Sequence, residues 1–520
     1  MDTEVLIVGA GPTGLMLANQ LARRGLRPLI IERNTGPALQ TRALGVQART
    51  LEIYQHLGIA AQAVENGQKG MGANLWADGR KMARVTLAEA GADITRFPFI
   101  LILGQDENER LLGERLRAQG MTVTWNTELL DLQQKPDRVT VTLRGPDDAI
   151  LEKEFSWVAG CDGAHSAVRR LASIDFPGAA YGHTFFVADT EVTGEMVPDE
   201  VNVFLWRQGF HLFFPMRGLD HWRIVGIVPP ELRERDDLTL DSVTPSLLRE
   251  ANELRFRSCS WFSTYRIHHR SAAHFRAGRC FLLGDAAHIH SPVGAQGMNT
   301  GLQDAYNLAW KLALVLRGEA DNALLDTYES ERLPVAQRLL NTTDRAFRLV
   351  VSDSPLAGLL RTQLLARIMA FGMRRKAIQR AAFRVVSQTG IRYRHSRLSQ
   401  ATDGVPVRAP HAGDRFPWLK LRLRAQGPVE DLFEVLDDTR FTLLLIGQEL
   451  PDDRLSAAGA LSVCVIPQDA ANARELKRAH IPRRCFYLLR PDGHIGLCGL
   501  RLHATAIRAY LSVRVGMRPR

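Results

Sequence analysis

The chain has 520 residues, which is enough for two or three domains around a large hydrophobic core. Its hydrophobic fraction of 45% and charged fraction of 23% are globular values, and no apolar stretch is long enough to predict a transmembrane helix. The formal net charge is +10, but Lys and Arg are scattered over most of the chain, so nucleic-acid binding is not indicated.

The six cysteines show neither a C-x-x-C pair nor metal-ligand spacing. Several lie in apolar runs, so we expect buried free thiols, no metal site and a reduced, cytoplasmic setting. The apolar run near the N-terminus follows Asp2 and Glu4 and is interrupted by glycines, which argues against a signal peptide.

The first motif predicts a dinucleotide site. An apolar strand over residues 5–8 runs into a G-x-G-x-x-G pattern made by Gly9, Gly11 and Gly14. A helix follows, and a second strand over residues 28–31 ends at Glu32. The first two glycines allow a tight turn and close approach of a pyrophosphate, and the third lets helix and strand pack. Glu32 stands where an acid binds ribose hydroxyls, which favours an adenosine without a 2′-phosphate, as in FAD or NAD.

The next segment, from Arg42 to Thr50, opens a helix that is predicted to run through Leu57. Arg42 and Arg49 are seven residues apart, so they share one helical face if the helix begins early enough. Two interpretations stay open: the arginines approach a pyrophosphate or a nicotinamide cofactor, or Arg49 lies on a solvated face.

A second turn follows the strand that ends near Gly160. Asp162 and Gly163 form an Asp-Gly turn, and Ser166 is placed to cap the helix after it. Such turns are common, and this one gains meaning as one of three loops suited to place polar groups near a shared dinucleotide.

The third loop lies between an apolar strand at residues 279–283 and a helix whose apolar residues recur from Leu302 to Leu316. It carries Asp285 at its mouth, and Gly318 marks the expected end of the helix. A glycine-rich loop at a helix N-terminus exposes backbone N–H groups and a positive dipole end. This arrangement suits a flavin, with ribityl hydroxyls on Asp285 and the pyrimidine edge at the helix start. The alternative is an ordinary strand-to-helix turn with an N-cap.

Residues 176–274 are rich in apolar strands and predict a sheet that walls an aromatic pocket. Tyr265, His211 and His288 are the candidate polar groups at that wall, although core packing is the default for each. Between Arg361 and Arg397 the chain is basic and has no acid. Its amphipathic character is compatible with a membrane surface, but a solvated face or an acidic partner is favoured. From about residue 405, strands over 441–446 and 461–465, a hairpin around Arg490–Gly493 and a helix from Ala504 to Val513 predict a further domain.

Together, GAGPTGL with Glu32, CDGAHSAVR, and GDAAHIHSPVGAQGMNTGLQDAYNLAWKLA resemble the class A FAD-dependent aromatic hydroxylases. The similarity is greatest to the branch of phenol hydroxylases, pentachlorophenol monooxygenases and polyketide hydroxylases. The resemblance implies an α/β fold with three parts. A Rossmann-like FAD-binding domain would take residues 1–175, with 74–104 contributing to the substrate domain, and would return over 275–400 with a helical segment. A mixed β-sheet substrate domain (176–274) is inserted into it, and a thioredoxin-like domain without C-x-x-C (401–520) follows. For the last part we expect a structural or oligomeric role, including a homodimer.

The resemblance also implies a set of cofactor residues. Arg42 and Gln105 would contact FAD together with Arg33, while Asp162 would lie near FAD and the nicotinamide. Backbone in the third loop would lie along the isoalloxazine, through Pro292, Gly294, Gly297, Met298 and Asn299. Ala295 stands where many relatives have a second glycine, which affects fine positioning. Tyr265 and Pro292 are the candidate catalytic residues.

The implied reaction uses NADPH or NADH to reduce FAD and O₂ to form a C4a-hydroperoxide, which hydroxylates a phenolic or polycyclic aromatic substrate. Two alternatives remain: a flavin-dependent reductase or dehydrogenase without oxygen insertion, and a non-catalytic flavoprotein that binds an aromatic ligand.

Overall fold

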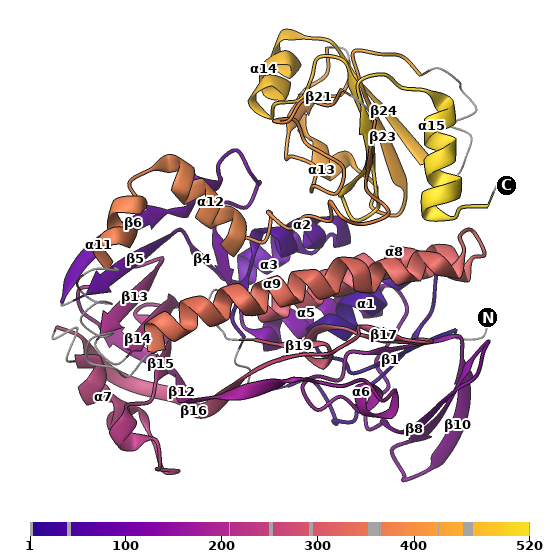
Figure 1. Ribbon diagram of the computed structural model, residues 1–520. Coiled ribbons are helices and arrows are strands. Elements are labelled where there is room, and N and C mark those ends of the chain that lie inside the picture. The colour runs from indigo at the N-terminus through magenta and orange to yellow at the C-terminus, as the bar shows by residue number, and fades with distance from the viewer. Residues whose placement is uncertain are drawn as a thin grey trace.

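The computed structural model describes residues 4–38, 43–77, 79–206, 209–248, 253–290, 295–351, 363, 366–402, 404–424, 426–450 and 461–518. It has a mixed α/β fold with several sheets (Figure 1). The first is a five-stranded sheet in the order β17-β18-β11-β1-β2, in which all neighbours are parallel except β17 and β18. Its strands are β1 (Val5–Val8), β2 (Leu29–Ile31), β11 (Trp157–Gly160), β17 (Arg276–Ala277) and β18 (Cys280–Leu282).

The strands of this parallel sheet are short apolar runs, as expected for a sheet that is covered on both faces. Every residue of β1, β11 and β18 is buried. Helix α1 (Pro12–Arg23) packs against α8 (Gly297–Leu316) and α5 (Gln105–Ala118). An antiparallel sheet of β8 (Glu128–Gln134), β9 (Val139–Arg144) and β10 (Ile150–Phe155) precedes β11, and α6 (Ala167–Leu171) follows it.

A separate eight-stranded sheet has the order β19-β16-β12-β15-β14-β13-β5-β6. Most of it comes from β12 (Gly178–Thr193), β13 (Glu200–Trp206), β14 (Gly209–Pro215), β15 (His221–Ile227) and β16 (Arg255–Ser271). The earlier strands β5 (Gly72–Ala77) and β6 (Arg80–Thr86) extend it by a parallel pairing of β5 with β13, and β19 (His288–Ile289) closes the other edge.

The two faces of this sheet have different neighbours, because side chains alternate along a strand. One face, with Phe186 and Phe213, packs on helix α7 (Leu240–Leu248). The other carries Phe214 and Met216, which pack against Ile102 in the small sheet of β3 (Gly45–Val46), β4 (Gln68–Gly70) and β7 (Ile100–Ile102). This second face is therefore turned toward the nucleotide-binding part.

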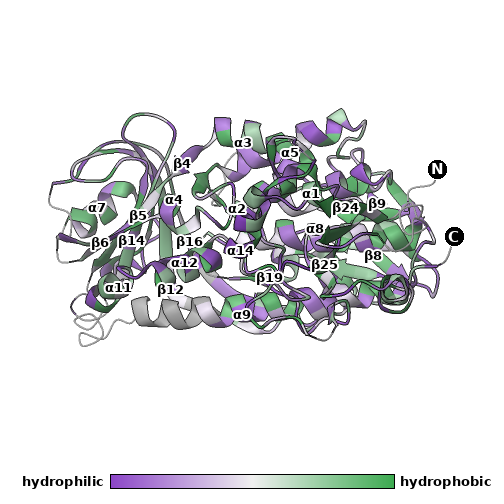
Figure 2. Ribbon diagram, turned by 90° about the horizontal axis from the view of Figure 1, so that it is seen from above, coloured by the Kyte–Doolittle hydropathy of each residue, from purple (hydrophilic) through white to green (hydrophobic). Residues whose placement is uncertain are grey.

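The helix that follows the third loop, α8, lies in the middle of the molecule (Figure 1). Helix α8 begins at Gly297, ends at Leu316, and is followed by Gly318 with φ of +67°, which confirms the predicted helix and its stop. The long helix α9 (Asp326–Val351) runs beside it in Figure 1. In Figure 2, which is coloured by hydropathy, β24 and β25 are mostly hydrophobic, while the coloured part of α9 carries both hydrophilic and hydrophobic residues.

The basic segment contains α11 (Ala366–Gly372) and α12 (Lys376–Val386) where it is described. Helix α12 packs on α4 (Leu87–Gly91) with Phe383 buried, and Arg380 forms an ion pair with Asp93. One face of α12 is thus packed on the protein itself, and one exposed arginine pairs with an acid, whereas the role of the basic segment stays a prediction.

The C-terminal part is built on a sheet in the order β20-β26-β25-β23-β24. The predicted parallel pair is confirmed by β23 (Phe441–Ile446) and β24 (Leu461–Ile466), and the predicted hairpin by β25 (Cys485–Leu489) and β26 (Ile495–Gly499). The predicted final helix is only partly correct, because α15 (Ala504–Ala509) continues as a π-helical turn over Tyr510–Val515. The remaining elements of this part are β20 (Gln400–Ala401), β21 (Lys420–Arg422), β22 (Val429–Asp431), α13 (Leu432–Val435) and α14 (Ala470–Arg478).

The predicted helix from Arg42 begins later than expected. Helix α2 (Ala48–Leu57) starts six residues after Arg42, which lies outside the described residues, and α3 (Ala60–Asn66) follows it. Arg49 is 5% exposed, forms an ion pair with Glu52 at 3.0 Å, and donates to the backbone carbonyl of Asp492 at 2.6 Å. Both open interpretations of Arg49 are therefore wrong: it is neither solvated nor directed at a cofactor, because it joins α2 to the C-terminal part.

All six cysteines are free, and Cys161, Cys280, Cys485 and Cys498 are buried. Within the described ranges, no helix combines the length and the apolar character needed to cross a membrane.

Candidate active site

The turn between β1 and α1 is shaped by its three glycines. Gly9 has φ of +103°, and a Cβ on it would lie 2.4 Å from the carbonyl oxygen of Cys161. A Cβ on Gly14 would lie 2.0 Å from the carbonyl oxygen of Gly9, so this glycine lets helix and turn touch. Gly11 is different, because no described atom lies within 4 Å of the place where its Cβ would stand. The N-terminus of α1 has no side-chain cap, so open backbone and uncapped N–H groups form a cradle that fits a pyrophosphate.

Glu32 closes the side of this cradle. Its carboxylate accepts hydrogen bonds from the backbone N–H of Ala10 at 2.9 Å and of Asn34 at 3.1 Å. Arg33 is exposed beside it. Gln105, the first residue of α5, donates to Glu109 at 2.8 Å. Burial raises the pKa of the Glu109 carboxyl, and the charge of Glu32 adds to that rise. The sequence offered no signal for Glu109, because it lies among other polar residues of a helix.

The Asp162 turn makes the second loop. One carboxylate oxygen of Asp162 accepts from the backbone N–H of Ala167 at 2.6 Å and of Val168 at 3.1 Å. The other oxygen, Oδ1, is buried and has no hydrogen-bond partner among the described residues, and burial raises the pKa of this carboxyl. Ser166 accepts from the N–H of Arg169 at 3.0 Å, which confirms the predicted cap. A buried acceptor without a donor fits a bound group that supplies one.

Contacts between the turns bring all three loops together. Arg169 donates to the carbonyl of Ala286 at 2.8 Å, which joins the second loop to the third. Thr13 of α1 lies close to both Gly284 and Gly301. A Cβ on Gly284 would lie 2.7 Å from the Thr13 Oγ1, and a Cβ on Gly301 would lie 2.4 Å from the same atom. With Gly9 against Cys161, three distant segments of the chain form one site.

In the third loop, Asp285 is exposed, and its carboxylate accepts no hydrogen bond from the part of the chain that the structure describes. The protein packed around its other sides nonetheless raises the pKa of the carboxyl by desolvation. An accessible acid with unused acceptors, held by a rigid turn, is chemically suited to the hydroxyls of a polyol.

The turn is held rigid by Asp304, a residue that the sequence analysis missed. Asp304 is fully buried in α8 and accepts from Arg332 at 2.6 Å, His288 at 2.8 Å and the backbone N–H of Gly284 at 3.1 Å. Burial alone would raise the pKa of Asp304, but the charges of Arg332 and His288 hold it below its usual value. An acid inside an otherwise apolar helical stripe was the signal that could have identified it.

The start of α8 is the third feature of this loop. It has no side-chain cap, and its first residues are Gly297, Met298 and Asn299. The Asn299 side chain is fully used, because it accepts from the Gln47 N–H at 2.8 Å and donates to the carbonyl of Gly45 at 2.8 Å. This leaves the backbone of the helix start, and not the Asn299 amide, to meet a ligand.

Two details complete the description of this segment. The Met298 sulfur accepts from Asn108 at 3.2 Å. Ala295 has φ of +50°, in the left-handed region that favours glycine, and the position of a Cβ on Gly45 lies 2.7 Å from the Ala295 methyl. The predicted residues Arg42, Pro292 and Gly294 lie outside the described residues, so their roles stay predictions.

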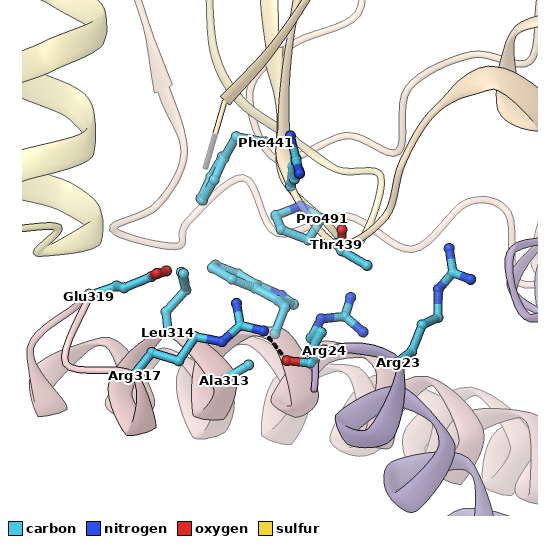
Figure 3. Close-up of a pocket in the computed structure, with 11 residues that line it drawn as sticks. Arg23, Arg24, Ala313, Leu314, Arg317, Glu319, Thr439, Phe441 and Pro491 are labelled. Atoms are coloured by element: carbon cyan, nitrogen blue, oxygen red, sulfur yellow. Dashed lines mark hydrogen bonds between the residues drawn. The ribbon is translucent and has the colours of Figure 1, made fainter. Parts of the chain in front are cut away.

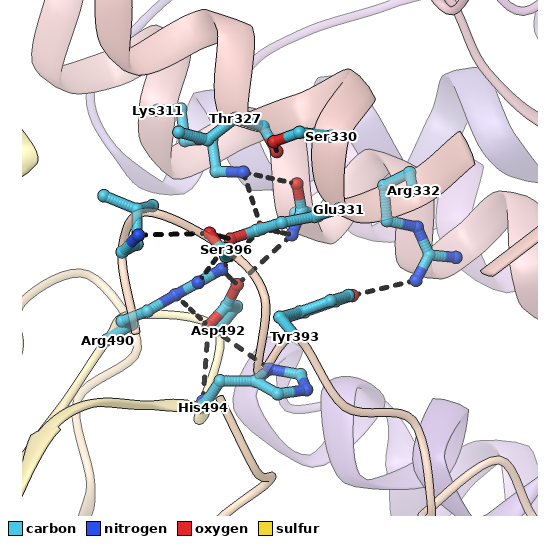
Figure 4. A network of polar contacts seen from close by, with 12 residues as sticks. Lys311, Thr327, Ser330, Glu331, Arg332, Tyr393, Ser396, Arg490, Asp492 and His494 are labelled. Carbon is cyan, nitrogen blue, oxygen red and sulfur yellow. Dashed lines mark hydrogen bonds and ion pairs between the residues drawn. The ribbon is translucent and has the colours of Figure 1, made fainter. Parts of the chain in front are cut away.

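A buried polar network ties the third loop to the C-terminal part (Figure 4). Glu331, next to Arg332 in α9, accepts from Arg490 at 2.6 and 2.9 Å and from Lys311 at 2.8 Å. Arg332 also donates to the Tyr393 hydroxyl at 2.8 Å. Burial alone would raise the pKa of Glu331, but the charges of Arg490 and Lys311 hold it well below its ordinary value. Arg490, in the hairpin turn after β25, therefore contacts Glu331. The next residue, Arg332, is the one that orients Asp304.

The three candidate residues of the sheet wall have different positions. Tyr265 packs against Phe185, with ring centroids 6.0 Å apart, in a cluster on the face of the sheet that is turned toward the nucleotide-binding part. His211 is on the opposite face, 1% exposed, with its ring 5.2 Å from that of Trp206 and 6.0 Å from that of Phe186. His288 is buried against Asp304. His211 and His288 therefore follow the default expectation of core packing and not the alternative at the pocket wall, because the pleat and the loop direct both side chains into the core.

A cavity of about 330 Å³ lies between this inner face and the start of α5. Its lining includes Leu103 and Gly104 beside Gln105, and Asp189, Arg223 and Trp261 from the sheet. Arg223 holds Asp189 in a two-point ion pair, with both contacts at 2.6 Å, and its guanidinium lies 5.1 Å from the centre of the Trp261 ring. The cavity thus joins apolar surface with fixed polar groups, which is typical of small-molecule sites.

Comparison with known proteins agrees with this geometry. The FAD binding domain family matches residues 2–343. The chain is 33% identical over 527 residues to 6-methylpretetramide 4-monooxygenase of Streptomyces rimosus, covering 98% of this chain and 93% of that protein. It is 34% identical over 451 residues to pentachlorophenol 4-monooxygenase of Sphingobium chlorophenolicum, covering 85% and 80%. The solved structure of the anhydrotetracycline hydroxylase OxyS of Streptomyces rimosus matches all of both chains with a TM-score of 0.79 and 29% identity.

These matches confirm the resemblance that the three motifs indicated. The chain belongs to the family of FAD-binding aromatic hydroxylases and monooxygenases.

Proposed function

We propose that this chain hydroxylates a phenolic or polycyclic aromatic substrate, using FAD, O₂ and NADPH or NADH. The observation that carries the proposal is the meeting of the three loops at one site. The face of the eight-stranded sheet that carries Tyr265 is the one turned toward the nucleotide-binding part. The relatives support the substrate class, because their names specify a chlorinated phenol and a polycyclic pretetramide.

FAD, when bound, supplies the redox chemistry and the activation of O₂. The residues of this chain bind and orient it. Gly11 would offer open backbone to the pyrophosphate, and Asp285 would accept from the ribityl hydroxyls. The uncapped start of α8 would stabilise negative charge on the flavin ring through its N–H groups. The sheet above would exclude water from the site.

The substrate site would include the cavity beside Gln105. Its Asp189–Arg223 pair is held in position by two hydrogen bonds, so it would bind polar substituents of the substrate, while Trp261 would contact the ring system. Tyr265 stays the candidate for handling the phenolic proton, since it lies on the same face of the sheet.

The division into domains at 1–175, 176–274, 275–400 and 401–520 belongs to this proposal. It is supported by the separate sheets and by β5 and β6, which come from the first segment and join the eight-stranded sheet. The thioredoxin-like nature of the last part, the homodimer and the cytoplasmic location are further expectations.

The direct test is product analysis. The purified protein, loaded with FAD, is incubated with a panel of phenols and polycyclic phenols, NADPH or NADH, and ¹⁸O₂. We expect faster NAD(P)H oxidation with at least one substrate and a product heavier by one labelled oxygen atom. Oxidation of NAD(P)H under nitrogen with an artificial acceptor, and no labelled product in air, would instead support the reductase alternative.

A further inference from the structure

A second cavity, of about 190 Å³, lies where the C-terminal part meets the ends of two helices (Figure 3). Its walls include Trp310, Phe441 and Pro491, and its lining contains four arginines: Arg23, Arg24, Arg317 and Arg440. Glu319 is the acid among its lining residues. Helices α1 and α8 begin at the cofactor loops and end here, and the 12 residues of α1 span about 18 Å, so this cavity is separate from the flavin site.

Arg24 provides the strongest evidence that the cavity is built for an anion. It is 3% exposed, and its Nη atoms donate to the carbonyl of Gln20 at 2.9 Å and to the carbonyl of Asp438 at 2.5 Å. Its Nε is buried and has no hydrogen-bond partner in the described part of the chain. Burial lowers the pKa of Arg24 despite the charge of Asp438, so this guanidinium lacks full compensation. A buried donor without a partner is costly, and an anion in the cavity would satisfy it.

Helix capping explains only part of the cluster. Cations are favourable at helix C-termini, and the bond from Arg317 to the Arg24 carbonyl is of this kind. Arg23 is paired with Asp438 at 2.8 Å. Arg440, however, comes from the C-terminal part and directly precedes β23, and its Nε lies 3.7 Å from a carboxylate oxygen of Asp437. Capping accounts neither for Arg440 nor for the open Nε of Arg24.

We propose that this cavity binds a small organic anion, whose carboxylate or phosphate meets the arginines. The volume of the cavity is large enough for such a ligand, since a cavity of about 150 Å³ holds a benzene ring. Planar guanidinium groups suit both anions, because they offer two parallel donors to two oxygens. Because the site lies between two parts of the chain, its ligand would also strengthen their contact.

The test uses the full-length protein saturated with FAD, in a phosphate-free buffer of low ionic strength. Titration calorimetry is carried out with benzoate, phenyl phosphate and inorganic phosphate, and with neutral benzamide as the comparison. We expect one-to-one binding of benzoate or phenyl phosphate, at least tenfold tighter than benzamide. The two aromatic anions distinguish carboxylate from phosphate as the bound group, and inorganic phosphate measures the contribution of the ring.

Variants of the lining arginines show whether the heat of binding measured by calorimetry comes from this cavity. Arg317→Ala and Arg440→Ala are expected to weaken binding about tenfold each, since both side chains are exposed enough to be removed without disturbing the core. Arg501→Ala is the matched control, an exposed arginine that does not line the cavity, and it should bind as the unaltered protein does. Equal affinity in all three variants, equal weakening in all three, or no saturable binding of any anion would overturn the proposal. Binding that shifts the flavin absorbance and is unchanged in Arg317→Ala would place the ligand at the flavin and also refute it.

Discussion

His211 is a buried histidine whose neutral form the fold requires, so it should make the protein sensitive to mild acid. Burial lowers the pKa of its imidazole from 6.5 to about 3, and aromatic rings pack against it. When the pKa of a base is lower in the folded state, the stability is complete above the pKa of the unfolded state and is lost as the pH falls toward the folded value. The affected window is therefore pH 6.5 to about 3.

The size of the effect follows from this pKa difference. Each pH unit within the window costs about 1.4 kcal/mol, so the loss at pH 5 is about 2 kcal/mol. His211→Phe keeps an aromatic ring between Trp206 and Phe186 and removes the titration. When the pH is lowered from 8 to 5, the unfolding free energy of both proteins falls. We expect the fall to be about 2 kcal/mol smaller for His211→Phe than for the unaltered protein.

The assay is urea unfolding at pH 8 and pH 5, followed by tryptophan fluorescence, to which Trp206 beside the imidazole contributes. His268→Phe is the matched control, because His268 is an exposed residue of the same sheet. If His211→Phe and the unaltered protein lose the same stability between the two pH values, the reasoning about a neutral buried imidazole is refuted.

Three further predictions concern the cofactor loops. Asp285→Ala should weaken FAD binding roughly 10- to 150-fold, because a hydrogen bond to a charged group contributes about 1.5–3 kcal/mol; unchanged FAD retention on dialysis would contradict the role of this acid. Asp304→Ala should lower the stability of the FAD-loaded protein by about 3–5 kcal/mol, since it leaves the Arg332 charge buried and unpaired. Urea titration of the FAD-loaded protein, followed by FAD release, measures this loss. In the same titration Asp326→Ala, which removes an exposed acid paired with Arg276, should cost less than about 1 kcal/mol; equal losses would exclude a special role of Asp304. Ala295→Gly should stabilise by about 0.5–1 kcal/mol by relieving the positive φ, and Gly45→Ala should be destabilising alone but tolerated with Ala295→Gly.

The last pair forms a double-mutant cycle, so it tests one contact directly. A Cβ on residue 45 would be 2.7 Å from the Ala295 methyl, and the clash disappears when that methyl is removed. If the change in melting temperature of the double variant equals the sum of the changes in the two single variants, the two positions are not in contact.

The buried network around Glu331 gives the C-terminal part a physical link to the flavin loop. Arg490 reaches Glu331, and the neighbouring Arg332 orients Asp304, which accepts from the backbone of Gly284. Replacing a member of such a network leaves its partners buried without compensation. We therefore expect Arg490→Gln to weaken FAD retention although Arg490 lies in another part of the chain. Unaltered retention with unaltered stability would argue against this link.

The sequence by itself determined the strand–turn–helix units and the cofactor. Gly9 and Gly14 are required because the turn brings backbone within contact distance, and such a requirement is visible in a few consecutive residues. The parallel strands were likewise recognisable, since strands covered on both faces are continuous apolar runs. The family followed from three such local signals that occur together.

The tertiary structure alone decided which polar residues work as partners. Asp304 with Arg332, Arg49 with Asp492 and the burial of His211 depend on segments that are distant in the chain and meet only after packing. The side on which a residue lies depends on the register of its strand, and a histidine looks the same in sequence whether it faces a ligand or a core. Local constraints leave a signature in neighbouring residues, whereas long-range partners are chosen by the packing of whole elements, and that is why the loops were predictable and the network behind them was not.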